Sequence, residues 1–395
     1  MVLPFRNLSD DPDQEYFSDG ITEDIIIELS RFPTLFVIAR HSSLSLKGQQ
    51  DDIRDVAKRL GVKYVAEGSV RKAGERVRIS VELAEAATRK QIWANRYDRS
   101  LDDIFAVQDE VVRTIVSALS GRVTSVEQKE AERKPTSNLS AYDYFLRGNS
   151  HFYRMTREDN LEARKMFQMA IASDPTFARA HARIAATHNV DAFLGLASSD
   201  SGALAKESIE AALKLDPEDS WVRETLGFTL LREKNFQEAE EQFERVLELN
   251  PNDAASIAWT AHAFVLLGRS EEAIELIQRA MRLDPLHPRS YRWTLAHAAF
   301  FVGDYEQTIR QLGRGPWFGS WQSLCLAAAY AQIGRRDDAR TELEKFLERR
   351  RQELRSRGLP LPSNVLDLAI ERANHFKRRE DRDRLLDGLR KAGLS

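Results

Sequence analysis

The spacing of hydrophobic and polar positions changes once along this chain. Residues 1 to about 122 alternate segments of two-residue period with segments of helical period, whereas everything after about residue 139 has the helical period. Between them, a charged and then polar stretch contains Pro135, which ends a helix. The pattern predicts an α+β fold: a small mixed-sheet α/β domain at 1–122, a linker at 123–139 and an all-α region at 140–395.

The first region predicts the element order β-α-β-α-β-β-β-α. Its clearest strand has Val77, Ile79, Val81 and Leu83 alternating with polar residues, which gives the strand one wet face. The other strands are expected at Val2–Phe5, Leu35–Ala39, Val62–Val70 and Gln91–Tyr97. The helices are expected around Ile21–Phe32, from the Asp51-Asp52 cap to Gly61, and at Asp102–Leu119. A strand that starts at residue 2 leaves no lead-in segment, so we expect further sequence upstream.

Three Asx-Pro pairs divide the helical region at equal steps of 34 residues: Asp216-Pro217, Asn250-Pro251 and Asp284-Pro285. This step is typical of tetratricopeptide repeats, in which each unit is a pair of helices. One unit cannot bury its apolar face alone, so neighbouring units stack into a solenoid whose concave side is an extended surface. The repeat therefore favours binding over catalysis.

Two adjacent units carry matching small residues where their paired helices approach closely, at Gly227 and Ala261 and again at Ala239 and Ala273. Weaker copies flank these units, and one has an insertion near Asn189–Asp200. We expect six helix pairs. A charged pair of helices should cap the array, at Ser363–Phe376 and Arg382–Lys391.

Composition narrows the function further. The chain has 58 basic and 61 acidic residues, a formal charge of −3, which disfavours nucleic-acid binding by the chain as a whole. Cys325 is the only cysteine, so neither an internal disulfide nor a cysteine-based metal cage can form. No apolar run approaches the roughly 20 residues that span a bilayer. The amino terminus does not have the pattern of a secretion signal, so we expect a cytoplasmic chain.

The first domain resembles the TolB-amino-terminal-like domain of bacterial signalling proteins. The resemblance is carried by Val2–Pro12, Glu15–Ile25, Glu67–Arg71 and Trp93–Arg99, and it covers residues 1 to about 120. It implies a sensor module that continues into tetratricopeptide repeats. In that family both modules typically follow an output domain: a class III adenylate or guanylate cyclase, a winged-helix DNA-binding domain or a protein kinase.

Candidate chemical sites are few. No phosphate-binding loop, dinucleotide fingerprint or catalytic triad motif occurs. His181 and His188, about 10 Å apart along one helix, cannot share one metal ion. The acidic loop Asp10–Asp13 could hold a cation or a partner, but helix capping by Ser18 or Asp19 is the simpler interpretation. Cys325 lies in an apolar run, which predicts an inert buried thiol. We expect neither a catalytic residue nor a cofactor.

The most specific expectation concerns the groove on the concave side of the repeat array. In tetratricopeptide folds, defined positions of each first helix face this side. Aromatic and arginine side chains there are favoured binding anchors for a protein or peptide partner. The resemblance places seven candidate partner-binding residues on it: Trp221, Phe228, Arg232, His262, Trp293, His297 and Trp321. Alternatively, some of them pack between repeats, or the groove binds the chain's own first domain.

The sequence thus predicts a non-catalytic regulatory and scaffolding chain in bacterial signal transduction. A ligand or partner that prefers one arrangement of the two domains would shift the population toward it. Two alternatives remain: the regulatory part of a class III adenylate cyclase, and the sensor part of a winged-helix transcription regulator.

Overall fold

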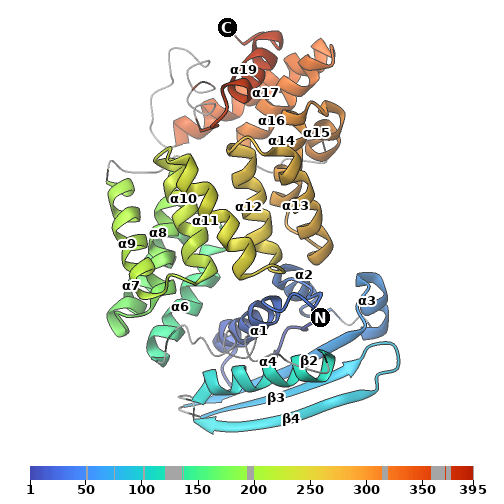
Figure 1. Cartoon of the computed structure of the whole chain (residues 1–395), viewed down its shortest axis with the longest axis vertical. Helices are drawn as coiled ribbons and strands as arrows, with labels where there is room; N and C mark the ends of the chain where they lie inside the picture. The colour runs from blue at the N-terminus through green and yellow to red at the C-terminus, as the bar shows by residue number, and fades with distance from the viewer. Residues whose placement is uncertain are drawn as a thin grey trace. The chain divides into compact units, whose positions relative to one another are not determined.

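The amino-terminal region of this computed structural model is a four-stranded mixed sheet (Figure 1). The structure describes residues 1–49, 52–74, 76–100, 103–120, 136, 138–193, 200–313, 319–356, 370 and 375–394. The strand order is β1-β2-β3-β4, with β1 parallel to β2 and the other neighbours antiparallel. The strands span Arg6–Asn7, Tyr64–Ala73, Arg76–Glu85 and Gln91–Ser100.

The hairpin of β2 and β3 confirms the alternation seen in the sequence. Val77, Ile79, Val81 and Leu83 are all buried on one face of the sheet. The turn contains Gly74 with a positive φ of 59°, a conformation that glycine adopts without steric cost. The predicted hairpin is therefore present in the described residues.

Two strand predictions need correction. Residues 1–8 run beside β2 and exchange backbone hydrogen bonds with it at Leu3 and Leu8, but only Arg6–Asn7 is a strand. Leu35–Ala39 is not a strand at all. Its backbone is bonded elsewhere, because Leu35 O accepts from the Asn252 side chain and Ala39 N donates to Leu283 O. The extended segment is thus stabilised by the helical region instead of by the sheet.

Helices α1 and α4 lie on the same face of the sheet (Figure 1). They contribute Phe17, Ile21, Ile25 and Val111, among others, to one apolar core with the inward side chains of the strands. The short α3 has the predicted caps: Asp52 accepts from Arg54 N, and Gly61 ends it in the left-handed conformation. The helices of this region are α1 (Glu15–Ser30), α2 (Arg40–Leu44), α3 (Ile53–Leu60) and α4 (Ile104–Ser120).

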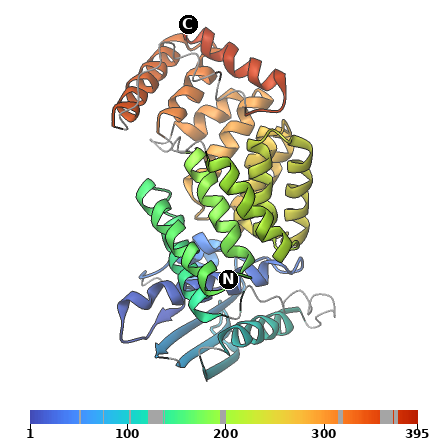
Figure 2. The same cartoon turned by 90° about the vertical axis from the view of Figure 1, so that its left-hand side faces the viewer.

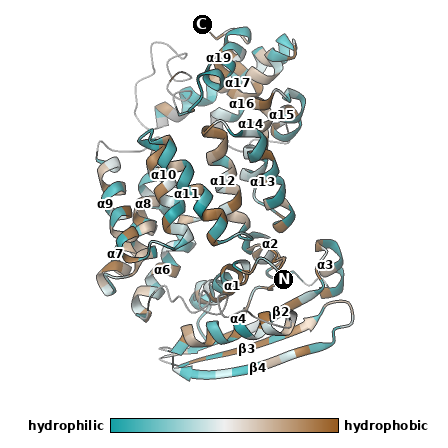
Figure 3. Ribbon diagram, in the orientation of Figure 1, coloured by the Kyte–Doolittle hydropathy of each residue, from teal (hydrophilic) through white to brown (hydrophobic). Residues whose placement is uncertain are grey.

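Six consecutive pairs of helices follow within the described residues, as predicted, and Figures 1 and 2 show the helical region that they form. Contacts within one unit pair α6 with α7, α8 with α9, α14 with α15 and α16 with α17. In Figure 3 the helix ribbons carry both hydrophobic and hydrophilic residues, as amphipathic helices do. The pairs are α6 (Leu139–Phe152) with α7 (Arg157–Ser173), α8 (Ala178–Phe193) with α9 (Ser201–Leu215), α10 (Ser220–Arg232) with α11 (Phe236–Leu249), α12 (Ala254–Leu266) with α13 (Ser270–Leu283), α14 (Arg289–Val302) with α15 (Tyr305–Leu312), and α16 (Gly319–Gln332) with α17 (Arg336–Ser356).

A helix is present at the second position of the predicted capping pair, and its capping role stays a prediction. This helix is α19 (Arg379–Lys391), which packs on α16 through Gly388 against Ala328. Most of the predicted helix at 363–376 and of the linker at 123–139 lies outside the described residues. So do residues 194–199 of the insertion predicted near Asn189–Asp200. The division at that linker stays a prediction.

Small residues let the paired helices approach closely, as the repeat predicts. Gly148 of α6 faces Phe167 of α7, and a Cβ added at Gly148 would lie 2.5 Å from the Phe167 ring. Ala239, Ala261 and Ala273 are fully buried. These contacts explain why the offsets recur in the sequence.

The chain divides into two compact units. The first comprises Met1–Thr229, Glu244–Ser256 and Arg282–Leu286, so the sheet belongs to the same unit as the first helix pairs and two of the repeat turns. The second comprises Leu230–Phe243, Ile257–Met281 and His287–Ser395.

Candidate functional site: the docking face of the first helix pairs

Within the first unit, α1 contacts α6 through a shared apolar core, polar side chains and one glycine. The Tyr16 hydroxyl donates to the Asp143 carboxylate, and Arg147 donates to the Tyr16 oxygen at 3.0 Å. Gly20 lies directly against Leu146, because a Cβ built on Gly20 would come within 2.5 Å of the Leu146 Cδ1. The close approach of the two helices therefore depends on the missing side chain.

Asp24 of α1 is buried at this contact. Its carboxylate accepts hydrogen bonds from the Tyr142 hydroxyl of α6 and from Gln108 Nε2 of α4, the latter at 3.1 Å. Burial raises the pKa of Asp24 to about 6, although the bond from Tyr142 acts in the opposite direction. The Tyr142 ring also packs edge-on against Phe17 and Phe105. One tyrosine thus supplies both apolar and polar contacts.

Glu23, one position earlier, binds two groups. It accepts from the hydroxyl of Tyr153, the residue after α6, at 2.7 Å and forms an ion pair with Arg40 Nε at 2.9 Å. Arg183 of α8 donates to the same Tyr153 oxygen at 3.0 Å. Burial, followed by the negative charge of Glu23, raises the pKa of Tyr153 above its usual value, so this hydroxyl stays a hydrogen-bond donor.

A buried ion pair continues the polar contact toward α8 and α10. Arg179 Nε lies 2.7 Å from Asp219 Oδ2, and the two side chains are only 7% and 5% exposed. The nearby Glu28 of α1 has its pKa raised to about 7 by burial, against the opposing attraction of Arg31 and then Arg179. A buried charge is costly unless paired, so Arg179 stabilises several acidic groups at once.

The turn after Asn250-Pro251 binds the end of α1. The Asn252 amide nitrogen donates to Ser30 O at 3.3 Å, and its side-chain Nδ2 donates to Phe32 O and Leu35 O at 3.0 Å each. One asparagine of a repeat turn therefore satisfies three carbonyl groups at and beyond the last turn of α1.

The next repeat turn, at Asp284-Pro285, binds α2 in the same way. Asp284 accepts from the Ser42 backbone amide at 2.9 Å and from the Ser42 hydroxyl. The Ser42 oxygen in turn accepts from Leu286 N at 2.8 Å, and Ala39 N donates to Leu283 O at 2.8 Å. The Asx-Pro turns that reveal the repeat in the sequence thus also bind the amino-terminal region.

Of the predicted partner-binding residues, Trp221 and Phe228 lie in the first unit, and both are half-buried. The guanidinium of Arg183 lies 4.2 Å and that of Arg179 5.0 Å from the Trp221 ring centre, and Phe145 packs beside it. Trp221 therefore packs within the chain, next to the α1 contact.

The other predicted residues lie in the second unit. Trp293 and His297 pack together, with ring centres 4.0 Å apart, and they are only 5% and 9% exposed. Trp321 packs against Phe346, across the pair of α16 and α17. Arg232 and His262 are half-buried.

Sequence reasoning missed Trp259, which is 41% exposed on α12 and packs edge-on to His262 at 6.3 Å. It lies three positions before His262, so helical spacing could have found it.

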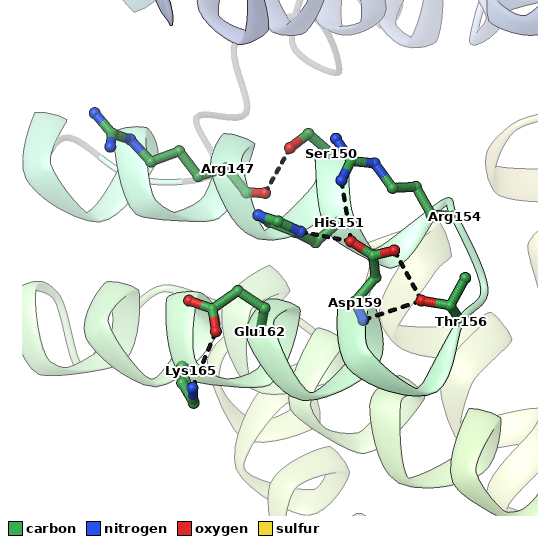
Figure 4. A network of polar contacts seen from close by, with 8 residues as sticks. All are labelled: Arg147, Ser150, His151, Arg154, Thr156, Asp159, Glu162 and Lys165. Carbon is green, nitrogen blue, oxygen red and sulfur yellow. Dashed lines mark hydrogen bonds and ion pairs between the residues drawn. The ribbon is translucent and has the colours of Figure 1, made fainter.

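The turn between α6 and α7 shows a polar network with a structural role (Figure 4). Asp159 accepts from His151 Nδ1 at 2.8 Å and from Arg154 at 3.0 Å, while Thr156 caps the Asp159 amide. These bonds lower the pKa of Asp159, that from His151 most strongly. The network closes the turn of the first helix pair.

Other candidate sites give no catalytic arrangement among the described residues. His181 and His188 line a cavity of about 470 Å³ between α7, α8 and α9. The part of the chain that the structure describes contains no group of three side chains able to hold a metal ion. Burial raises the pKa of Cys325 to about 12, as expected of an unreactive thiol. Among the described helices, none combines the length and apolarity needed to cross a membrane.

The prediction that Ser18 or Asp19 caps the helix after the acidic loop was wrong. Helix α1 already begins at Glu15, so Ser18 and Asp19 lie inside it. Asp11 instead caps the short helix Pro12–Gln14 that precedes α1, and its side chain accepts a hydrogen bond from Asp13 N. The acidic residues thus form a turn, as the simpler interpretation expected.

Comparisons with known proteins support the repeats and change the view of the sheet region. Residues 196–263 and 230–295 match the tetratricopeptide repeat family. Residues 1–114 match the second domain of HilA/YgeH-like transcriptional regulators.

A protein of Rhizobium meliloti (strain 1021), named "Putative adenylate cyclase 3", is 43% identical over 242 residues, which is 60% of this chain. The chain spans about two fifths of that relative's length, 41%. Among solved structures, Pseudomonas aeruginosa PilF is similar with 18% identity and a TM-score of 0.38, covering 51% of this chain and 88% of its own. A thermophilic tetratricopeptide protein of Thermus thermophilus has 17% identity and a TM-score of 0.37, covering 52% and 98%.

Proposed function

We propose that this chain is a non-catalytic regulatory and scaffolding protein of cytoplasmic bacterial signal transduction. Its repeats bind a protein or peptide partner, and its TolB-like amino-terminal domain responds to that binding. The observation that carries the proposal is the exposed ring of Trp259 beside His262 on the first helix of a repeat. A partner that favours one arrangement of the chain shifts the population toward it.

The partner surface that we propose lies on the first helices of the repeats, at the predicted residues that keep exposure. Trp259 and His262 present a tryptophan and an imidazole side by side on α12, and aromatic anchors of this kind bury a large area at low entropy cost. Arg232 and Trp321 extend the proposed surface within the second unit. Trp293 and His297 are almost fully buried, so they would support this surface by packing beneath it within the second unit. Phe228 is a further candidate in the first unit.

The test is site-specific photo-crosslinking in cells, with the crosslinker at position 262 of the full chain. We expect one dominant crosslinked partner, lost on Trp259→Ala. A crosslinker at Leu204, which is 42% exposed on α9, serves as the control. Equal capture of the same partner from both positions would contradict the proposed surface.

One alternative is that this sequence is the regulatory part of an adenylate cyclase. The relative named as a cyclase, with 43% identity over 242 residues, favours this alternative. The genomic reading frame before Met1 tests it. A cyclase catalytic domain in frame would support it, and a stop codon directly upstream would exclude it.

A second alternative, the sensor part of a winged-helix regulator, is favoured by the match of residues 1–114 to a transcriptional regulator's second domain. The same reading frame would show a winged-helix domain instead. Both alternatives keep the proposed role of the helix pairs as a binding surface.

A further inference from the structure

The two edges of the sheet differ in length and protection. Strand β1 forms one edge and is only two residues long, Arg6–Asn7. Strand β4 forms the other edge, runs for ten residues from Gln91 to Ser100 and contains no proline. Among the described residues, no strand pairs with the outer edge of β4. A long edge strand without proline is a surface on which another strand can add.

The hydrogen-bond pattern of the sheet shows which backbone groups of β4 point outward. Ala66 and Val70 of β2 bond to residues 1–8. Alternate residues of a strand direct their backbone groups to opposite sides, so the registers of β2–β3 and β3–β4 place the outward groups of β4 at even-numbered positions. In agreement, Arg96 N donates to the Asn95 side chain at 2.9 Å. The residues whose backbone groups face a further strand are Ala94, Arg96, Asp98 and Ser100.

The side chains of this edge carry opposite charges two positions apart. Tyr97 is buried in the core beneath α1 and α4, so Arg96 and Asp98 lie on the other face of the sheet. Asp98 already binds Arg76 and Arg78 of β3, and a carboxylate has further acceptor sites. When a second β4 lies antiparallel and centred on Tyr97, Arg96 of each copy faces Asp98 of the other. The edge is therefore complementary to itself.

Other registers fit less well. Pairing centred on Asn95 would include Gln91 and the residue after it, where the pairing of β3 with β4 is irregular. Pairing centred on Arg96 would set two arginines opposite each other, and pairing centred on Asp98 would set two aspartates opposite each other. Like charges directly opposite are destabilising. The register centred on Tyr97 uses the regular residues 94–100 and matches opposite charges twice.

We propose that two copies of this chain pair through their β4 strands, antiparallel and centred on Tyr97, so that two four-stranded sheets become one continuous sheet. Backbone hydrogen bonds from Arg96 to Asp98 of the second copy, and the reverse, supply the affinity. Exposed ion pairs are each worth little, so the charges mainly choose the register. This interface is separate from the partner surface proposed on α12.

Sedimentation equilibrium of the full chain tests the pairing, and we expect a monomer–dimer equilibrium. Arg96→Asp places like charges opposite each other twice, so it should raise the dissociation constant of the dimer at least tenfold. Arg157→Asp makes the same change of charge at an exposed arginine of α7 and should leave the constant unchanged. The mass of one chain at every concentration, or an equal effect of the two variants, would overturn the proposal.

Cysteine crosslinking tests the register without disturbing the core. Ala94 and Ser100 are exposed and face each other across the proposed interface. With a short bismaleimide, a mixture of Ala94→Cys chains and Ser100→Cys chains should give at least fivefold more crosslinked dimer than either chain alone. Cys325 is buried, so it should not react.

Arg96→Asp, added to both cysteine variants, should remove most of the crosslinked dimer. Crosslinking of Ala94→Cys chains alone as strong as that of the mixture would overturn the register. A mixture that gives no crosslinked dimer would overturn the β4 interface, even if the chain dimerises by another surface.

Discussion

The contact inside the first helix pair differs sharply from the contact between that pair and α1. Inside the pair, Gly148 and Phe167 are both buried and meet in a close-packed apolar contact. At the contact with α1, Glu23, Asp24 and Tyr142 add hydrogen bonds and ion pairs to the apolar core that α1 shares with α6. The difference teaches that one repeat packs by apolar contact alone on one side and adds buried charged and polar groups on the other.

The largest expected effect comes from breaking the apolar contact. Phe167→Ala removes a fully buried ring, and the free energy of unfolding of the first unit should fall by about 3–5 kcal/mol. Urea denaturation of the full chain, followed by circular dichroism, measures this loss. Phe36→Ala is the matched control, because Phe36 is 56% exposed and should change stability by less than about 0.5 kcal/mol. Similar losses for the two variants would contradict the close packing.

The next effect concerns the buried ion pair of the polar contact. Arg179→Met leaves Asp219 buried without its cation, which should cost about 3 kcal/mol in the same measurement. Adding Asp219→Asn removes the stranded charge and keeps the cap of α10, so the double variant should recover part of the loss. Arg154→Met, at an exposed arginine, is the control. A double variant less stable than the single one would refute the role of the pair.

The polar contact should respond to mild acid, as should Glu224 of α10, whose pKa burial raises to about 7. Burial raises the pKa of Asp24 to about 6 and of Glu28 to about 7, so the docked state takes up protons that the undocked state releases. The stability that these groups contribute is fully present below their unfolded values and is lost as pH rises through about 6 to 7. Docking should therefore strengthen as pH falls from about 8 to about 5, by up to about 1.4 kcal/mol per pH unit for each proton bound.

Denaturation of the full chain across this pH range measures the slope. The charged groups that act on Glu28 are Arg31, Arg179, Asp24 and Asp219. Glu28→Gln should flatten the pH dependence, whereas Glu28→Asp should keep it. An unchanged slope in Glu28→Gln would show that the response arises elsewhere.

The smallest expected effect concerns the turn between α6 and α7, which Figure 4 shows. Thr156→Ala removes the cap of α7 and should cost about 1 kcal/mol, without changing the pH dependence of docking. Thr156→Ser should restore most of the loss. A change in the pH slope with Thr156→Ala would mean that this turn and the α1 contact are coupled.

The sequence predicted the helix pairs of the repeats well, but it did not predict which other segments the repeats contact. The 34-residue step and the small residues at Gly148 and Ala239 are local patterns, and they set the helix pairs correctly. The segment at 35–39 looked like a strand because its residues are apolar, but its hydrogen bonds go to Asn252 and Leu283, more than 200 positions away. A local sequence pattern cannot reveal hydrogen-bond partners that lie so far away along the chain.

The candidate site shows the same limit. Trp221 stood out because it is an aromatic residue at a groove position, yet Arg179 and Arg183 pack on it and it lies within the chain. The acidic side of α1 went unnoticed, because Glu23 and Asp24 look like ordinary solvated residues of an amphipathic helix. Only the fold brings Tyr153 and Tyr142 to them.

The central claim is that the polar contacts of the repeat turns with α1 and α2 are less stable than the apolar packing inside a helix pair. Among the described residues, four backbone amides donate across these turn contacts, those of Ala39, Ser42, Asn252 and Leu286. Residue-resolved hydrogen exchange of the full chain compares them with amides inside α7. The account predicts that the four amides exchange together, at least tenfold faster than those of α7, and faster still in Glu23→Gln. Exchange of all these amides at one common rate, in wild type and variant alike, would contradict it.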